Sequence, residues 1–404
     1  MTIQKRVSKS IFWLCLGGMV FPISAVGQEY SPGIKLNGLT ISPYVNVEVA
    51  YDSNIIFDGE RKLRDFFYRI NPGLDLTYQG NEWGMIGSLW YAHSWYQDYT
   101  LKNYDRWGER LSIYRESAKG WKIVVSESYV ESDQNETWYY TNGGDGVWRN
   151  RHQLDINAAL SYAFNERLSA GLNVMFSEMW YDNKTDKVGG LFGWQQWTVG
   201  GEVSHRLTER TRALVTAAYH EYYTKAKDAT FSRTSRNYSF MGGLMSELTE
   251  RIKYRAVAGV SLYEYGEETS AAPSYTLDAS WLISKKLAAT VAGAGYFQPN
   301  ERTGNQRKTV YTLSGGLTYR PINRLTLTLD GIYRGEDNQT VGNNAVKWND
   351  YSRNQYTIRA KANYRLQKYV SVYGAAEYTT QESNRSVKDD WERYLITVGL
   401  SLRY

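Results

Sequence analysis

Charged side chains recur at every second position in several stretches of this chain. In residues 148–164 the even positions from 154 onward are apolar or aromatic, and most odd positions, among them Arg151 and Asp155, are polar. Residues 356–366 repeat the pattern, with Arg359 on the polar side. A period of two gathers these charges on one face of an extended strand. Such a face can attract or repel passing ions, but it lacks the compact constellation that bond-breaking chemistry requires.

The polar faces carry both signs of charge. The basic candidates for lining a water-filled pore are Arg149, Arg151, Arg206, Lys253, Arg255, Arg359, Lys361 and Arg365. The acidic candidates are Glu48, Asp75, Asp155, Glu202, Asp278 and Asp330. Two hypotheses stand side by side. A basic wall near Arg151, Arg255 and Arg359 would favour anionic solutes or an acidic glycan, whereas a mixed wall of neighbouring ion pairs would give no selectivity.

Candidates for enzyme chemistry are weak. The four histidines are His93, His152, His205 and His220. Only His93 has a neighbouring hydroxyl, that of Ser94, and no Gly-rich or oxyanion-hole element accompanies the pair. The segment Gly143–Gly146 contains a single carboxylate, which is too few ligands for calcium. We therefore expect no enzymatic activity, no metal site and no cofactor.

The elements that must hold these faces are β-strands. Period-two alternation recurs along the chain, and helical periodicity is not visible over any comparable length. Short polar turns alternate with longer, variable breaks rich in Gly, Asn, Asp, Ser and Thr, and the short turns recur roughly every 40 residues. Eight short turns that join nine up-and-down pairs predict about 18 strands. The alternative is about 16 strands, if the poorly alternating region Trp83–Tyr114 contains a loop.

The final strand indicates which kind of all-β fold this is. From Tyr394 to Tyr404 every even residue is apolar or aromatic, and the pattern runs to the last residue. A propeller or sandwich also alternates, but it could not hide an opposite face rich in Arg, Lys, Asp and Asn. A closed barrel can, because its interior is water-filled. The sequence thus predicts a transmembrane antiparallel up-and-down barrel with short periplasmic turns, longer extracellular loops and aromatic girdles at both interfaces.

The N-terminal segment reads as a secretory signal peptide. Lys5, Arg6 and Lys9 precede a mostly apolar run that is too short for a membrane helix, and small residues follow at 25–27. We expect residues 1–27 to be the signal, 28–40 a short periplasmic segment and 41–404 the barrel. Removal of the signal lowers the formal charge of +5 by three, and this near-neutral balance argues against nucleic acid as a partner. It also removes Cys15, the only cysteine.

Two segments near the start of the predicted barrel resemble one family. Tyr51-Asp52-Ser53-Asn54-Ile55 and Arg69-Ile70-Asn71-Pro72-Gly73-Leu74 are similar to the turn and the Pro-Gly-Leu segment of the β-barrel porin 2 family. The C-terminal Gly399-Leu400-Ser401-Leu402-Arg403-Tyr404 resembles the assembly signal of outer-membrane barrels, with Gly399, Leu402 and Tyr404 as its main positions. It departs from that signal at Val398, where a polar residue is usual. The resemblance implies barrel-assembly machinery as a partner and a role in exopolysaccharide export with periplasmic polysaccharide-export proteins.

The expected function is passage of polar solutes across the outer membrane of a bacterium. Export of an exopolysaccharide is the specific version that the family resemblance implies. A general diffusion porin for small solutes is one alternative, and a structural or adhesive barrel with a blocked lumen is another. Conductance separates the last from the first two, and the effect of deletion on secreted polymer separates export from general diffusion.

Overall fold

The computed structural model describes most of the chain from residue 33 onward. The described ranges are 33–60, 62–100, 103–135, 148–181, 193–224, 234–266, 268–299, 306–340, 350–384 and 390–404. The predicted signal peptide and the segment Gly143–Gly146 lie outside them. No helix in the described part of the chain is long and apolar enough to span a bilayer.

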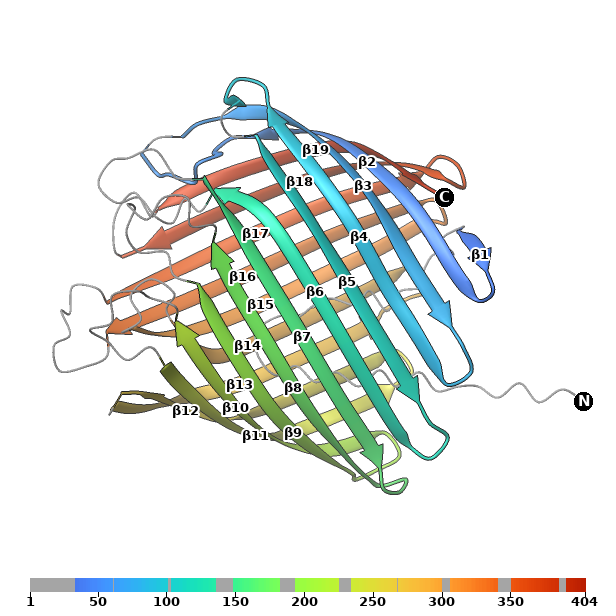
Figure 1. Ribbon diagram of the computed structural model, residues 1–404, viewed down its shortest axis with the longest axis vertical. Helices are drawn as coiled ribbons and strands as arrows, with labels where there is room; N and C mark the ends of the chain where they lie inside the picture. The colour runs from blue at the N-terminus through green and yellow to red at the C-terminus, as the bar shows by residue number, and fades with distance from the viewer. Residues whose placement is uncertain are drawn as a thin grey trace, which may run out of the picture.

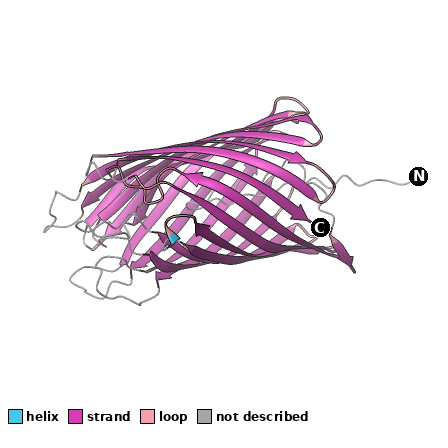
Figure 2. Ribbon diagram, turned by 90° about the horizontal axis from the view of Figure 1, so that it is seen from above, coloured by secondary structure: helices cyan, strands magenta, loops and turns pink. Residues whose placement is uncertain are grey.

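The fold is a closed antiparallel barrel of eighteen strands, β2–β19, to which the short strand β1 is added (Figures 1 and 2). The strands are β1 (Ile34–Leu36), β2 (Leu39–Asp52), β3 (Asp65–Gln79), β4 (Trp83–Tyr96), β5 (Tyr104–Glu116), β6 (Trp121–Asn135), β7 (Trp148–Ala163), β8 (Leu168–Tyr181), β9 (Trp194–Arg206), β10 (Thr211–Thr224), β11 (Thr234–Thr249), β12 (Ile252–Tyr265), β13 (Glu268–Leu282), β14 (Leu287–Pro299), β15 (Gln306–Ile322), β16 (Leu325–Thr340), β17 (Tyr351–Arg365), β18 (Val370–Ser383) and β19 (Trp391–Arg403). Consecutive strands pair in order, and β19 pairs back with β2 to close the wall.

The prediction of about 18 strands is confirmed, and the alternative of 16 is wrong. The poorly alternating region Trp83–Tyr114 supplies two full strands, β4 and β5. Its alternation is weak because carboxylates and a histidine stand at outward positions of these strands, as described below. At the start of the chain, the wall begins at Leu39 rather than at residue 41, and β1 forms a small hairpin with β2 inside the predicted periplasmic segment.

The short turns are stabilised by their own side chains. In the turn between β7 and β8, the Asn165 Oδ1 accepts hydrogen bonds from the backbone N–H groups of Arg167 and Leu168, at 2.8 and 2.9 Å. Thr208 and Thr249 play the same part in two further turns. Because the side chain replaces a backbone acceptor, this sequence pattern fixes a tight reversal. The C-terminus lies at the same end of the barrel as these turns (Figure 1).

The outer wall is apolar and exposed. On β19 the outward side chains of Tyr394, Ile396 and Val398 are 51%, 52% and 63% exposed, a level that is unfavourable in water and ordinary in lipid. Exposed aromatic rings such as Trp83 and Trp281 stand near the short turns, and others such as Trp197 near the opposite ends of the strands. Amphipathic rings at two levels mark the two faces of a bilayer. The protein is a bacterial outer-membrane barrel.

Candidate functional site: the inner wall and the mouth of the barrel

The inner wall at the closing seam is an ordered polar network. Glu48 of β2 accepts a hydrogen bond from the Tyr373 hydroxyl at 2.6 Å and forms an ion pair with Arg69 of β3 at 3.3 Å. The Arg69 Nε donates to the Ser94 hydroxyl at 2.8 Å, and a second guanidinium nitrogen donates to the Tyr104 hydroxyl. The network therefore links five strands across the seam, from β18 to β5. Of these residues, the sequence predicted Glu48 and missed Arg69.

A second pair closes the seam near the periplasmic end. Asp75 of β3 lies 2.8 Å from the Arg403 guanidinium of β19, and Arg403 also stacks over the Tyr44 ring at 4.8 Å. Arg403 stands at an odd position of the last strand, opposite the apolar even face, so its inward direction follows from the alternation that the sequence displays. Asp75 was a predicted candidate, whereas Arg403 was missed.

The residues of the assembly-like signal have distinct roles at this seam. Gly399 lies directly opposite Tyr373 on β18, whose ring covers it so closely that a Cβ there would be 2.4 Å from the Tyr373 Cζ. Leu402 is 45% exposed on the outer face. Tyr404 stacks on Tyr369 at 5.2 Å, and its backbone N–H donates to the Pro43 carbonyl at 3.0 Å. The signal residues thus pair the end of the chain with its first barrel strand.

Strands β11 and β12 approach each other closely at glycines. Gly259 approaches the neighbouring strand so closely that a Cβ would lie 1.8 Å from the Phe240 carbonyl oxygen. Arg255 of β12 reaches across β10 and β11 to Glu202 of β9, at 2.6 Å, and both side chains are nearly buried. Asp278 of β13 lies directly opposite Arg255. All three predicted residues meet here.

Other predicted lumen residues form contacts on the inner faces of β16–β18. The Arg359 Nε donates to Glu377 of β18 at 2.7 Å, and Lys361 lies over the Tyr373 ring at 5.0 Å. Asp330 of β16 is directly opposite Arg359. The sequence did not predict Glu377.

On the other side of the barrel, Asp155 of β7 accepts hydrogen bonds from Gln153 at 3.0 Å and from Ser177 at 2.6 Å. Arg151 donates to the same Gln153 at 2.9 Å. Arg151 and Asp155 thus lie on one face of β7, as their spacing in the sequence predicts.

Three predicted basic residues lie at the periplasmic rim instead of the middle of the lumen. Arg206 donates to the carbonyls of Thr208 and Glu209 in its own turn. Lys253 pairs with Glu247 at 2.6 Å, and Arg365 donates to the Asn323 carbonyl at 3.3 Å. The side chain of Arg149 lies outside the described part of the structure.

Several inward charges escaped the sequence prediction. The most concentrated group surrounds Glu336 of β16, which has Lys308 at 3.8 Å, Arg334 at 2.6 Å and Arg353 at 3.7 Å. Arg106 of β5 faces inward and lies over the Trp90 ring at 5.2 Å. Arg110 shares this inner face of β5. The inward direction of these residues follows from the period-two alternation of their strands. Acidic residues at the outward positions between them made the alternation difficult to recognise.

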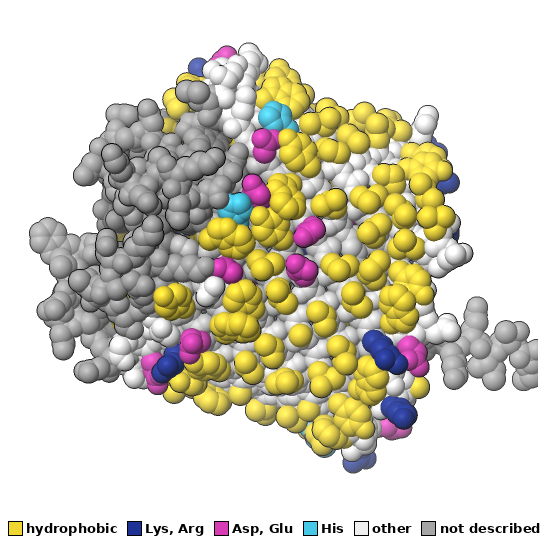
Figure 3. Space-filling model, viewed as in Figure 1, with side chains coloured by type: hydrophobic (Ala, Val, Ile, Leu, Met, Phe, Trp, Pro, Cys, Tyr) yellow, Lys and Arg dark blue, Asp and Glu magenta, His cyan; other side chains and the backbone are white. Residues whose placement is uncertain are grey.

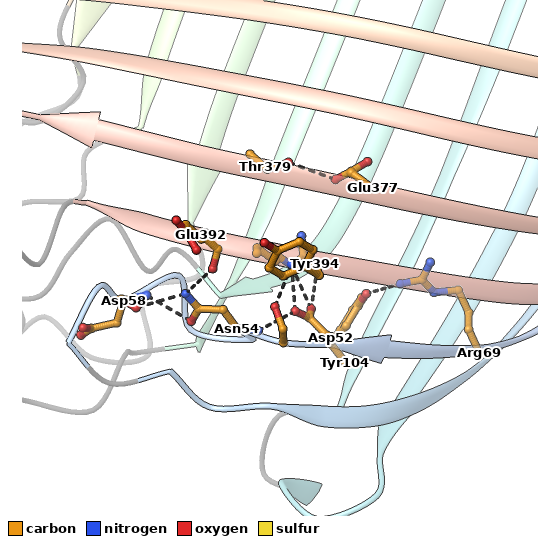
Figure 4. A network of polar contacts seen from close by, with 11 residues as sticks. Asp52, Asn54, Asp58, Arg69, Tyr104, Glu377, Thr379, Glu392 and Tyr394 are labelled. Carbon is orange, nitrogen blue, oxygen red and sulfur yellow. Dashed lines mark hydrogen bonds and ion pairs between the residues drawn. The ribbon is translucent and has the colours of Figure 1, made fainter.

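Polar contacts hold the segment that follows β2 at the extracellular end of the closing seam (Figure 4). The backbone N–H of Asn54 donates to Asp52 at 3.0 Å, and its amide donates to the carbonyls of Asp58 and Glu392 at 3.1 and 3.0 Å. The Arg393 Nε donates to the two Asp52 carboxylate oxygens at 2.9 and 3.0 Å. Asn54 is fully buried. These contacts connect the first and last strands of the barrel at the extracellular end.

Apolar packing holds the same segment inside the barrel. Ile55 and Ile56 are 4% and 5% exposed and form a cluster with Phe67 and Tyr96, which belong to the inner faces of β3 and β4. Phe57 has a positive φ of 52°, which costs backbone energy for a residue with a side chain. Because this segment packs against the inner wall, it occupies part of the lumen cross-section at the seam.

His93 and Ser94 do not form a catalytic pair. They are consecutive strand residues and point to opposite faces: Ser94 inward to Arg69, and His93 outward, where its Nδ1 lies 2.8 Å from Asp105. Among the described residues, no group of three or more His, Cys, Asp and Glu side chains is arranged to hold a metal ion.

No protein-family model and no curated protein matches the chain. Solved structures resemble it in fold. The FrpB iron transporter from Neisseria meningitidis is 9% identical, with a TM-score of 0.48 over 90% of this chain and 81% of that one. The siderophore receptor PirA from Acinetobacter baumannii is 7% identical, with a TM-score of 0.46 over 90% and 80%. The ferric citrate transporter FecA is 11% identical, with a TM-score of 0.45 over 84% and 60%.

Proposed function

We propose that the barrel is a channel through which polar solutes cross the outer membrane in hydrated form. The observation that supports it best is the set of ion pairs spread around the inner wall, such as Glu48–Arg69, Glu202–Arg255 and Arg359–Glu377. Charged side chains on the inward face require water or a paired charge beside them, and a water-filled lumen provides the first. A barrel of this strand number is wide enough for an aqueous channel.

The channel prefers anions. The inner face of β5 and β6 carries three cations, Arg106, Arg110 and Lys122, and one carboxylate, Glu116, which lies 4.0 Å from Lys122 at the periplasmic end. Glu336 is outnumbered by three cations. Positive potential inside a low-dielectric wall raises the local concentration of anions. Arg255 and Arg359, by contrast, are neutralised by carboxylates, so the preference rests on residues other than those two.

Reversal potentials in planar bilayers test both statements. We expect the wild-type protein to conduct and to favour chloride over potassium under a salt gradient. The double variant Arg106→Gln/Arg110→Gln should move the reversal potential toward zero, because it removes two lumen charges. Lys368→Gln, in a periplasmic turn, is the matched control and should leave it unchanged. A wild-type protein without conductance would favour the structural barrel with a blocked lumen.

A second candidate is export of an acidic exopolysaccharide with the aid of periplasmic partners. Besides the family resemblance, aromatic rings beside lumen cations favour it: Trp90 lies next to Arg106, and Tyr114 lies next to Lys122 at 6.0 Å. A ring and a cation together suit a sugar that bears a carboxylate. Deletion of the gene should abolish secreted polymer, and Trp90→Ala should reduce it. Unchanged polymer with slower solute uptake would leave the general diffusion porin as the function.

A further inference from the structure

The outer wall over β4–β8 carries charges at mid-depth, where the wall over β15–β18 is apolar. Outward positions are recognised by their register with exposed apolar residues, and on β4–β8 several of them are ionisable. They are Asp105, Glu109, Glu127, Glu131 and Glu178, together with His93 and His152. Figure 3 shows acidic and histidine side chains among the hydrophobic side chains of this face.

Two of these carboxylates lie in the middle of the apolar band. Glu127 is directly opposite Leu111, and Glu109 is directly opposite Tyr129, so the two glutamates are diagonal neighbours on β5 and β6 at roughly 7 Å. Both are exposed, and neither has a hydrogen bond or ion pair with any described residue. An ionised carboxylate that faces hydrocarbon is costly, and a like charge beside it adds to the cost. Lipid is therefore a poor neighbour for this part of the wall.

The surrounding polar residues form an ordered surface rather than a scatter of charges. The Trp107 Nε1 donates to Glu131 at 2.8 Å. The Tyr129 hydroxyl lies 2.9 Å from the His152 Nδ1, and the His152 ring stacks on Trp180 at 5.1 Å. These contacts fix rings and polar groups on the outside of the barrel, next to the two unpartnered glutamates. Aromatic side chains such as Trp107, Tyr129 and Trp180 are enriched at protein interfaces.

The charges of this chain do not complement the patch. Among the strand residues whose side chains the structure describes, the outward cations are Arg115 at a periplasmic turn, which pairs with Glu82 at 3.1 Å, and Arg236, which pairs with Glu221 at 3.4 Å. The described side chains of a second copy would therefore bring no free cation to the depth of Glu109 and Glu127. The occupant must supply its own positive charge.

We propose that the outer wall over β4–β8 is the docking surface for a different protein embedded in the outer membrane, whose Lys or Arg side chains pair with Glu109 and Glu127. Pairing offsets the free-energy cost of exposing the two carboxylates to hydrocarbon. A partner cation in lipid has a similar cost when it is unpaired, so the contact is specific for a partner that bears one.

Site-specific photo-crosslinking in the producing bacterium tests this surface. The photoreactive p-benzoylphenylalanine replaces Leu111, which lies between the two glutamates, or Leu317 on the opposite wall as the matched control. We expect a protein adduct from position 111 and none from position 317. The adduct should fall at least tenfold in Glu109→Gln/Glu127→Gln, while the faster migration of the unheated barrel in gel electrophoresis shows that this variant still folds.

The partner is then tested by charge exchange. The crosslinked peptide should contain a Lys or Arg, Glu127→Lys should abolish the adduct, and replacement of that partner cation by Glu should restore it. An adduct with a second copy of the chain, an adduct with lipid alone, or a protein adduct that persists in the double Gln variant would overturn the proposal. So would a crosslinked partner segment that has no basic residue or that charge exchange does not rescue.

Discussion

The outer walls over β5–β8 and over β15–β18 follow the same alternation and present different chemistry. Over β15–β18 the outward residues at mid-depth are apolar, such as Leu317, Leu329 and Ile358, all more than 40% exposed. Over β5 and β6 the same depth holds Glu109 and Glu127. The inner faces of the two walls are alike, since both carry arginines. The difference therefore concerns what lies outside the barrel, and not the lumen.

This comparison separates two kinds of information in a strand. The period of two decides only which side chains share a face. Which face meets lipid, water or protein depends on the chemistry of the neighbours in the closed sheet. An apolar wall is stable in contact with lipid alone, whereas a wall with carboxylates at the same depth needs a protein partner that pairs with them. A uniform lipid coat would leave the two walls with very different stabilities.

The largest expected effect comes from one arginine placed on each wall. Leu317→Arg should destabilise the barrel by about 2–4 kcal/mol in phosphatidylcholine vesicles, the usual cost of a cation at the bilayer midplane. Leu111→Arg should cost much less, because the new guanidinium would lie directly opposite Glu127 and diagonal to no other cation. Denaturant unfolding in vesicles, followed by tryptophan fluorescence, measures both. Equal costs would contradict the assignment of Glu127 to the lipid-facing side.

Two glycines on the neighbouring strands β18 and β19 allow a comparison of the inner and outer faces of the wall. Gly399 is covered by the Tyr373 ring on the inner face, whereas a Cβ on the outward Gly374 would have no closer neighbour than the Thr397 carbonyl at 3.9 Å. Gly399→Val should destabilise the barrel by about 1–3 kcal/mol through overpacking. Gly374→Val should be close to neutral. The same unfolding assay measures both, and an equal loss in the two variants would mean that the Tyr373–Gly399 contact has no special weight.

The closed fold was predictable from the sequence because its strands and its short turns are each specified by residues that are close together in the chain. Alternation defines the strands, and Asn or Thr at the first position of a short turn supplies the side-chain acceptor that the turn needs. The strand count was ambiguous at Trp83–Tyr114 because Asp105 and Glu109 interrupt the apolar face there. The interruption that made the region resemble a loop is the feature that sets its outer wall apart.

The pairing within the lumen was less predictable. Arg255 and Glu202 were both recognised as inward, but their contact crosses two intervening strands, so the order of the strands alone does not reveal it. Glu336 escaped notice although three cations surround it, because its strand carries charges close together near the loop end. A sequence gives the direction of a side chain through its period, whereas distances between strands arise only when the sheet curves.

The smallest expected effect concerns the periplasmic edge of the acidic wall. Arg115, the outward cation of β5, pairs with Glu82 at 3.1 Å, and both side chains are more than half exposed. Glu82→Gln should change the free energy of unfolding by no more than about 0.5 kcal/mol, because exposed ion pairs contribute little and are screened by salt. Unfolding at low and high salt measures it. A loss well above about 1 kcal/mol, the upper limit for an exposed pair, would mean that this rim is covered, and the partner surface would then extend from Glu127 to the periplasmic turn.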